Sequence, residues 1–130
     1  MCFFFSFLMK GNADVNGVTK AGDTALIWAA RNGHQHIVKL LISLGADINI
    51  VDNKGYSALL WATQNEHYEI TKELVVFGAE INATITEGDF AGYTTLTFAS
   101  RRGEDELFDF LIENGAVIKY DEEAKKYIMQ

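Results

Sequence analysis

The sequence predicts an all-α solenoid, in which helix-turn-helix units are stacked and each unit carries a protruding finger. A segment that runs from Gly22 to Ala30 and is closed by Leu44-Gly-Ala-Asp-Ile-Asn returns 33 residues later, and a third copy follows at an offset of 37. Apolar residues recur at helical spacing inside each copy. A period of this length indicates supersecondary units that bury their apolar faces only against their neighbours.

The first helix of a unit is predicted from its capping residue and its apolar face. Thr24 stands at the N-cap position, where its hydroxyl can accept a backbone N–H. Leu26, Ala29 and Ala30 follow at helical spacing, and Gly33 ends the run as a C′ glycine. Small residues at positions 29, 30, 62 and 99 predict that neighbouring helices approach closely.

A second, antiparallel helix follows in each unit. Its apolar face in the first full copy consists of Ile37, Val38, Leu41 and Ile42, and Gly45 ends it. The residues after this glycine lead into a turn. Each unit is therefore predicted as a helix, a short turn, an antiparallel helix and a finger.

The 130 residues are predicted to form one domain, large enough to bury a core. Shifting the N-terminal residues by 33 positions aligns them with a second helix, so the chain is expected to open inside a repeat. We divide it into an N-terminal half repeat (1–18), three repeats (19–51, 52–88 and 89–118) and a C-terminal capping helix (119–130). The second repeat carries a finger that is longer by four residues within 83–88. This insertion either extends the reach toward a ligand or reflects drift in a surface loop.

The unit resembles the ankyrin repeat. In that family an opening Gly-x-Thr-Pro-Leu-His-x-Ala-Ala is followed by Gly-His, Ile-Val-x-x-Leu-Leu and Gly-Ala-Asp-Val-Asn. Residues of the first full copy that stand where the family pattern requires them are Gly22, Thr24, Leu26, Ala29, Ala30, Gly33, His34, Ile37, Val38, Leu41, Gly45, Ala46, Asp47 and Asn49. The resemblance covers residues 4 to about 118. It implies an L-shaped stack with β-hairpin fingers, which binds a partner protein on the concave face of fingers and first helices.

The sequence departs from the family pattern at several positions. The chain has no proline, and the slots of the motif proline are filled by Ala25, Ala58 and Thr95. The motif histidine, whose imidazole links adjacent units in the family, is replaced by Ile27, Leu60 and Thr97. Glu66 occupies the position of Gly33, and Thr71 stands where an aliphatic residue is usual. We expect the second unit to be the least stable of the three.

Composition and charge narrow the class of partner. Residues 61–130 contain 14 acids and 6 bases, whereas residues 1–60 contain 4 acids and 5 bases. An acidic surface disfavours nucleic acid and anionic lipid, which are bound by Lys and Arg, and no segment is long enough to span a membrane. The single cysteine fits a reducing compartment, so we expect a cytoplasmic location, with the nucleus as the alternative.

No catalytic, metal or cofactor site is predicted. The histidines His34 and His36 are two residues apart and point to different sides of a helix, and His67 is one period away. Cys2 has no basic or imidazole neighbour in sequence, and no serine stands in a nucleophile motif. We therefore expect a non-enzymatic protein that binds another protein.

The predicted contacts with this partner are positions that the repeat leaves free on the concave side. We consider tyrosine and arginine the strongest candidates among them, because these residue types contribute most of the binding energy in protein interfaces. The predicted binding residues are Arg31, Lys54, Tyr56, Gln64, Asn65, Phe90, Tyr93, Arg101 and Arg102. Trp28, Trp61 and Phe98 are in register one residue beyond the motif-histidine slot, and we expect them to pack between units, with their edges near the groove.

A phenylalanine-rich N-terminus supports an alternative hypothesis. Phe3, Phe4, Phe5 and Phe7 lie on an expected second helix that has no first helix to cover it. Clustered exposed aromatic residues favour association. On this alternative the chain is a fragment of a longer repeat protein or a self-associating one, with a homodimer formed through the N-terminal end.

Overall fold

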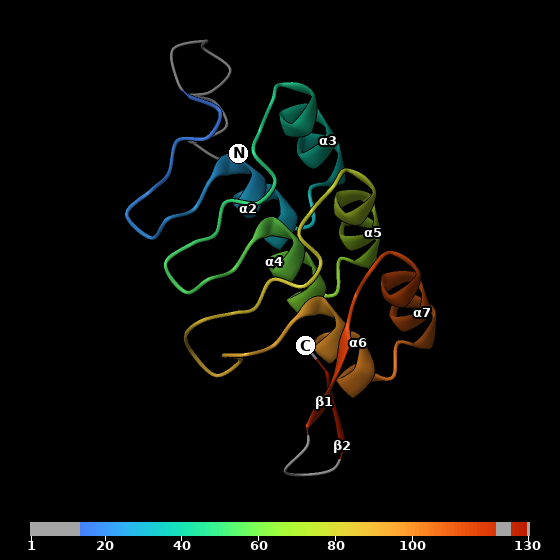
Figure 1. Cartoon of the computed structure of the whole chain (residues 1–130). Helices are drawn as coiled ribbons and strands as arrows, with labels where there is room; N and C mark the ends of the chain where they lie inside the picture. The colour runs from blue at the N-terminus through green and yellow to red at the C-terminus, as the bar shows by residue number, and fades with distance from the viewer. Residues whose placement is uncertain (1–13, 122–125, 130) are drawn as a thin grey trace.

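A computed structural model describes residues 14–121 and 126–129 of the chain. Their elements, in chain order, are α2 (Ala25–Arg31), α3 (Gln35–Ser43), α4 (Ala58–Gln64), α5 (Tyr68–Val76), α6 (Thr95–Arg102), α7 (Asp105–Glu113), β1 (Ile118–Asp121) and β2 (Lys126–Met129). The helices form three antiparallel pairs stacked side by side, with α2, α4 and α6 in one layer and α3, α5 and α7 in the other (Figure 1). The predicted all-α repeat solenoid is confirmed.

Hydroxyl side chains begin the first helix of every pair. The hydroxyls of Thr24, Ser57 and Thr94 accept the backbone N–H three residues on, at 3.1, 3.3 and 3.3 Å. Thr97 also accepts the backbone N–H of Thr94 at 3.2 Å, which completes a capping box. The N-cap predicted for Thr24 is confirmed. Thr97, which stands at the position of the motif histidine, helps to cap α6.

The small residues predicted at the helix contacts are buried. Ala29, Ala62 and Ala99 occupy equivalent positions of α2, α4 and α6, and each is at most 1% exposed. Neighbouring first helices pack directly on one another through this row. Leu26 and Leu59 are buried in one apolar cluster and Leu96 in a second, and the partly buried Val75 packs against both clusters.

Asparagine side chains link each unit to the next through backbone groups. The Oδ1 atoms of Asn16, Asn49 and Asn82 accept the backbone N–H of a residue one unit further on: Asp47 at 2.7 Å, Glu80 at 2.8 Å and Val117 at 3.0 Å. This asparagine ladder uses the final residues of the equivalent segments 12–16, 45–49 and 78–82. It satisfies donors that would otherwise be left without a protein partner at each second-helix exit.

Other links replace the one that the motif histidine supplies in the family. The carbonyl of Arg31, at the end of α2, accepts a hydrogen bond from Nδ2 of Asn65 at 2.9 Å and lies 3.2 Å from Nε2 of His67. Both side chains belong to the following unit. The C-terminal carbonyl of α2 is therefore satisfied by its neighbour rather than by its own chain segment.

Two features distinguish the second unit. Glu66 adopts φ +64°, as expected from its alignment with Gly33 and Gly103, and it is the one non-glycine residue with positive φ among the described residues. Thr63 and Thr71 are fully buried, and their hydroxyl oxygens lie 3.1 Å apart. Thr63 donates its hydroxyl proton to Leu59 O, one turn back in α4, at 2.8 Å. The single hydroxyl proton of Thr71 can then be donated either to Thr63 Oγ1 or to His67 O, which lies 3.3 Å away. Unit one has Ala30 and Val38 at these positions, so a polar contact here replaces an apolar one.

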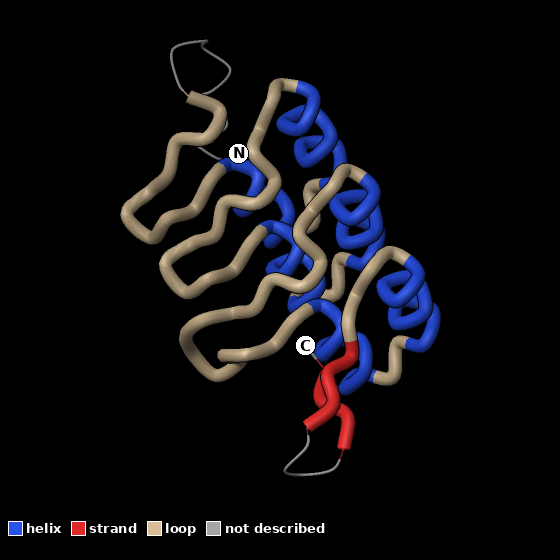
Figure 2. The backbone as a smooth tube through the Cα atoms, viewed as in Figure 1, coloured by secondary structure: helices blue, strands red, loops and turns tan. Residues whose placement is uncertain are grey.

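The fingers have fewer backbone hydrogen bonds between their two arms than the expected β-hairpins would have. Each is closed by a hairpin-type bond, from Thr19 N to Asp23 O, from Asp52 N to Tyr56 O and from Ile85 N to Tyr93 O, at 2.8–3.1 Å. Within the described residues they contain turns and no strand (Figure 2). The third finger has a second bond across its base, from Gly92 N to Ile85 O at 2.7 Å, but in none of the three fingers do these bonds extend into a strand ladder among the described residues.

The C-terminal capping helix predicted for 119–130 is wrong. Strands β1 and β2 form an antiparallel hairpin there, with Tyr120 opposite Tyr127 and Ile118 opposite Met129. β-Branched and aromatic residues at 117, 118, 120, 127 and 128 favour extended backbone, and the strands contain most of them. The β2 strand lies against α6, at the end of the stack.

A Glu66→Gly substitution is expected to raise the free energy of unfolding by about 1 kcal/mol, because only glycine adopts φ +64° without a Cβ penalty. Glu66 is exposed, so the change removes little packing. Urea denaturation followed by circular dichroism measures it. Glu66→Ala is the matched control, since it removes the carboxylate and keeps the Cβ. An equal gain from both variants would contradict a backbone origin.

Candidate protein-binding surface

The three fingers and the first helices lie on the same side of the stack (Figure 2), and we call the surface that they share the groove. Neighbouring fingers are joined directly. Asn53 donates from its backbone to Ala21 O at 3.0 Å and from Nδ2 to Lys20 O at 2.9 Å, and Thr86 N donates to Lys54 O at 3.0 Å. The fingers therefore form one continuous strip along the groove.

Two glycines permit this close approach of the fingers. Gly22 and Gly55 have φ of +84° and +86°. A Cβ at Gly22 would lie 3.0 Å from the backbone N of Asn53, and one at Gly55 would lie 2.7 Å from the backbone N of Thr86. Any other residue at either position would push the next finger away and would also be strained.

Tyr56 is not an exposed anchor, and the prediction that placed it on the binding surface is wrong. It is 5% exposed and stacks on Trp61, with ring centroids 4.2 Å apart. Burial raises the pKa of the Tyr56 hydroxyl, and the Asp52 and Asp89 carboxylates add to this effect. The repeat places Tyr56 in register with Tyr93, but only Tyr93 remains half-buried.

Asp52 fixes the conformation of the second finger, and the sequence reasoning missed it. Its Oδ1 accepts the backbone N–H groups of Lys54 and Tyr56, both at 2.9 Å, and its Oδ2 accepts Nε1 of Trp61 at 2.9 Å. An aspartate three residues before a finger glycine is a turn signal, because its side chain bonds the backbone two residues on. Asp52 is 8% exposed, and both of its carboxylate oxygens accept hydrogen bonds within the second unit.

We expect the aromatic row to pack between units, but the rings that Trp28, Trp61 and Phe98 contact belong to their own units. Trp28 and Trp61 are half-buried, and Phe98 is 2% exposed. Trp28 stacks with His34 at 4.9 Å between ring centroids. Phe98 packs with Phe90 and Tyr93 at 5.5 and 5.1 Å.

Arginine side chains lie over these rings. The guanidinium carbon of Arg31 is 5.1 Å from the centroid of Trp61, that of Arg101 is 5.1 Å from Tyr93, and that of Arg102 is 4.9 Å from Phe98. Arg31 also pairs with Asp23 at 3.1 Å. The Arg31 contact spans two units, the Arg101 contact joins α6 to the finger of its own unit, and the Arg102 contact lies within α6. The groove wall is thus built from cation–π pairs.

A shallow depression of about 320 Å³ opens between the first and second fingers. It is lined by Ala21, Asp23, Arg31, Asp52, Asn53, Lys54 and Trp61. Two predicted binding residues, Arg31 and Lys54, are brought together here. Lys54 is exposed, whereas Arg31 is half-buried by its contacts with Asp23 and Trp61.

The remaining predicted residues divide by their contacts. The side chains of Asn65 and Arg102 donate hydrogen bonds to the preceding unit. Asn65 donates to Arg31 O. Arg102 donates to Thr63 O at 2.7 Å and to Gln64 O at 2.8 Å. Gln64 is half-buried, and its Oε1 is buried without a hydrogen-bond partner among the described residues. Phe90 is half-buried against Tyr93. Phe3, Phe4, Phe5 and Phe7 lie outside the described residues.

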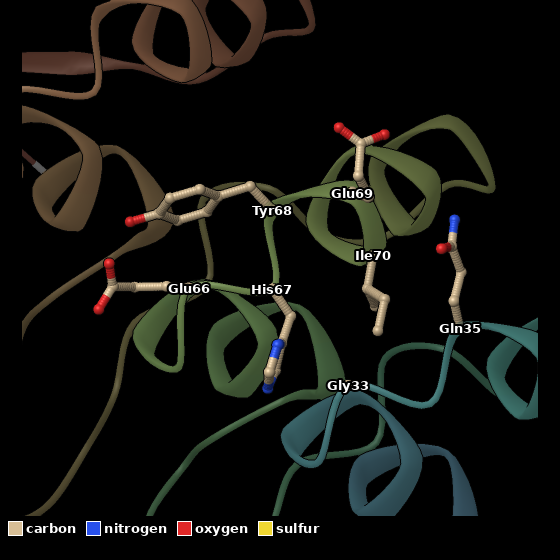
Figure 3. A pocket seen from close by; sticks show the side chains of 7 residues that line it. All are labelled: Gly33, Gln35, Glu66, His67, Tyr68, Glu69 and Ile70. Carbon is tan, nitrogen blue, oxygen red and sulfur yellow. The ribbon is translucent and has the colours of Figure 1, made fainter.

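A second depression lies where the helices of the first and second units meet their turns (Figure 3). Its side chains do not converge: Glu66 and Glu69 point away from the imidazole of His67, which is directed toward Gly33. A Cβ at Gly33 would lie 2.8 Å from that ring. The described residues also bring together no three His, Cys, Asp or Glu that could hold a metal. This site therefore joins units and offers no arrangement for acid–base chemistry.

An Arg102→Ala substitution is expected to lower the free energy of unfolding by roughly 1–2 kcal/mol, since two hydrogen bonds from a charged group are lost. The exposure of Arg102 keeps the estimate at the low end. Thermal and urea denaturation check it. Arg101→Ala is the control and is expected to change stability by less than about 0.5 kcal/mol; equal losses would show that the two arginines are not distinct.

Among residues 14–121 and 126–129, no helix has the length and apolar character needed to cross a bilayer. A family model described as ankyrin repeats (3 copies) matches residues 2–85, and no curated protein is similar to the sequence. The match ends before the third helix pair, α6 and α7, which nevertheless packs on α4 as α4 packs on α2. With the family model covering more than half of its length and the structure showing the same stacked unit, the chain belongs to the ankyrin-repeat family.

Proposed function

We propose that this chain is a non-enzymatic module that binds another protein in the groove of its fingers and first helices. Ankyrin repeats generally mediate protein–protein interaction. The observation that carries the proposal is the strip of hydrogen-bonded fingers, which holds the groove wall in place without a partner. A surface that is already ordered loses little conformational freedom on binding.

The side chains along this strip support a protein ligand rather than a small molecule. The depression between the first two fingers is shallow and open, and its main polar groups, Asp52 and the Arg31–Asp23 pair, are already engaged. Exposed Lys54 and half-buried Phe90 and Tyr93 offer separate contacts over two fingers. Aromatic and basic contacts spread over several units suit an extended protein surface.

We also propose that the chain does not bind nucleic acid and that it is located in the cytoplasm, on the basis of its net charge of −7 and its single cysteine. Binding of nucleic acid is disfavoured because it requires a basic surface. One cysteine is consistent with the reducing environment of the cytoplasm.

The double substitution Ala21→Trp/Ala91→Trp tests the groove. Both alanines are exposed on fingers, so indole rings there are expected to obstruct a partner and to leave the helices unchanged. Proteins retained by the immobilised wild-type chain from native cell extract are compared with those retained by the variant. A partner bound in the groove is expected to be lost by at least about tenfold.

Ser43→Trp/Glu113→Trp is the matched control for this experiment. These residues are exposed at equivalent positions near the ends of α3 and α7, in the layer of second helices. The control is expected to retain the partner. A partner that survives the finger substitutions and is lost with the control would place binding on the opposite layer and contradict the proposal.

A further inference from the structure

We propose that the partner segment carries an acidic side chain next to an apolar one, and that Arg101 receives its carboxylate. This inference rests on the proposed function, because it specifies the chemistry of the ligand that the same groove binds. It arises from a difference among three arginines that otherwise occupy similar settings.

Arg31, Arg101 and Arg102 all lie over aromatic rings, but only Arg101 has no acceptor for its side-chain N–H groups among the described residues. Arg31 donates to Asp23 at 3.1 Å, and Arg102 donates to the carbonyls of Thr63 and Gln64. Arg101 has no hydrogen bond or ion pair with any described residue, and it is exposed. Its donors are therefore available to a ligand.

The position of the Arg101 guanidinium is set before a ligand arrives. It lies 5.1 Å from the Tyr93 ring, which is itself packed against Phe90 at 5.3 Å and Phe98 at 5.1 Å. This contact restricts where the guanidinium lies, while the side chain stays exposed. The N–H groups of a guanidinium match a carboxylate in a two-bond arrangement.

The acids nearest the groove wall do not satisfy Arg101. Asp23 is paired with Arg31, and Asp52 is buried with both oxygens bonded within the second finger. The third finger adds exposed Glu87 and Asp89 near its tip, and among the ion pairs of the described residues neither is paired with Arg101. An acidic ligand group is therefore the complement of Arg101.

The residues near Arg101 indicate which other groups the partner segment carries beside its carboxylate. Phe90 and Tyr93 are half-buried and present apolar edges beside the guanidinium. One free guanidinium on a molecule of net charge −7 cannot replace the several cations that a phosphate backbone requires. The ligand is thus an acidic–apolar protein segment.

A random peptide library displayed on phage and selected on the wild-type full chain provides the probe. Selected peptides are synthesised with a fluorophore, and their affinities are measured by fluorescence anisotropy. We expect the selected sequences to share an Asp or Glu beside an apolar residue. Arg101→Ala is expected to weaken their binding about tenfold or more, and Arg101→Lys to restore part of it.

Two controls isolate the carboxylate contact. Lys39→Ala removes the same charge from α3, where Lys39 pairs with Glu73 at 3.6 Å, and it is expected to leave affinity unchanged. Replacing the shared Glu of a peptide by Gln is expected to weaken binding to the wild type and to have no further effect on Arg101→Ala. That pattern is the signature of a direct contact.

Two results would overturn the inference, and they differ in what else they affect. Peptides that are lost on Ala21→Trp/Ala91→Trp but bind Arg101→Ala as tightly as the wild type would refute the acidic contact and leave the groove function standing. Peptides that bind the groove-blocked variant as tightly as the wild type would refute both proposals.

Discussion

The structure depends on the contact between first helices of neighbouring units. The helices are seven to nine residues long, and isolated helices of this length are not stable in water. The alanine row of Ala29, Ala62 and Ala99 lets the backbones approach, and the leucines Leu26 and Leu59 on the first two of these helices are buried in one cluster shared by two units. Stability is therefore a property of the interfaces between units.

Hydrogen bonds between units give this apolar contact a fixed geometry. The asparagine ladder holds the exits of the second helices, the finger bonds hold the opposite side, and Asn65 and Arg102 bind the carbonyl ends of the first helices. Three lines of bonds at separate points oppose rotation of one unit against the next. The groove keeps its shape for this reason, and side chains such as Arg101 are held at defined positions along it.

Periodicity made most of the fold predictable. The N-cap residues, the alanine row and the positive φ of Glu66 all follow from aligning equivalent positions, because the backbone repeats with the sequence. The C-terminal hairpin could not be obtained in this way, since no copy of the repeat covers it. There the local preferences of strand-forming residues decide the structure.

The candidate site was less predictable than the fold, because alignment gives the position of a side chain and not its contacts. Tyr56 and Tyr93 are equivalent in sequence, yet the stack on Trp61 buries the first. Arg101 and Arg102 are adjacent, yet only Arg102 reaches the carbonyls of α4. The partner of a long side chain depends on the neighbouring unit, and the repeat pattern does not specify that.

The asparagine ladder has a consequence for the length of the molecule. Each bond of the ladder joins an asparagine acceptor to a backbone donor in the next unit, and the donor always lies on the C-terminal side of its acceptor in the sequence. Duplicating a block of 33 residues, such as 35–67, would reproduce each donor opposite an identical acceptor. The architecture thus permits growth or shortening by whole modules, whereas an insertion of any other size has to be absorbed in a finger, as the four extra residues within 83–88 are.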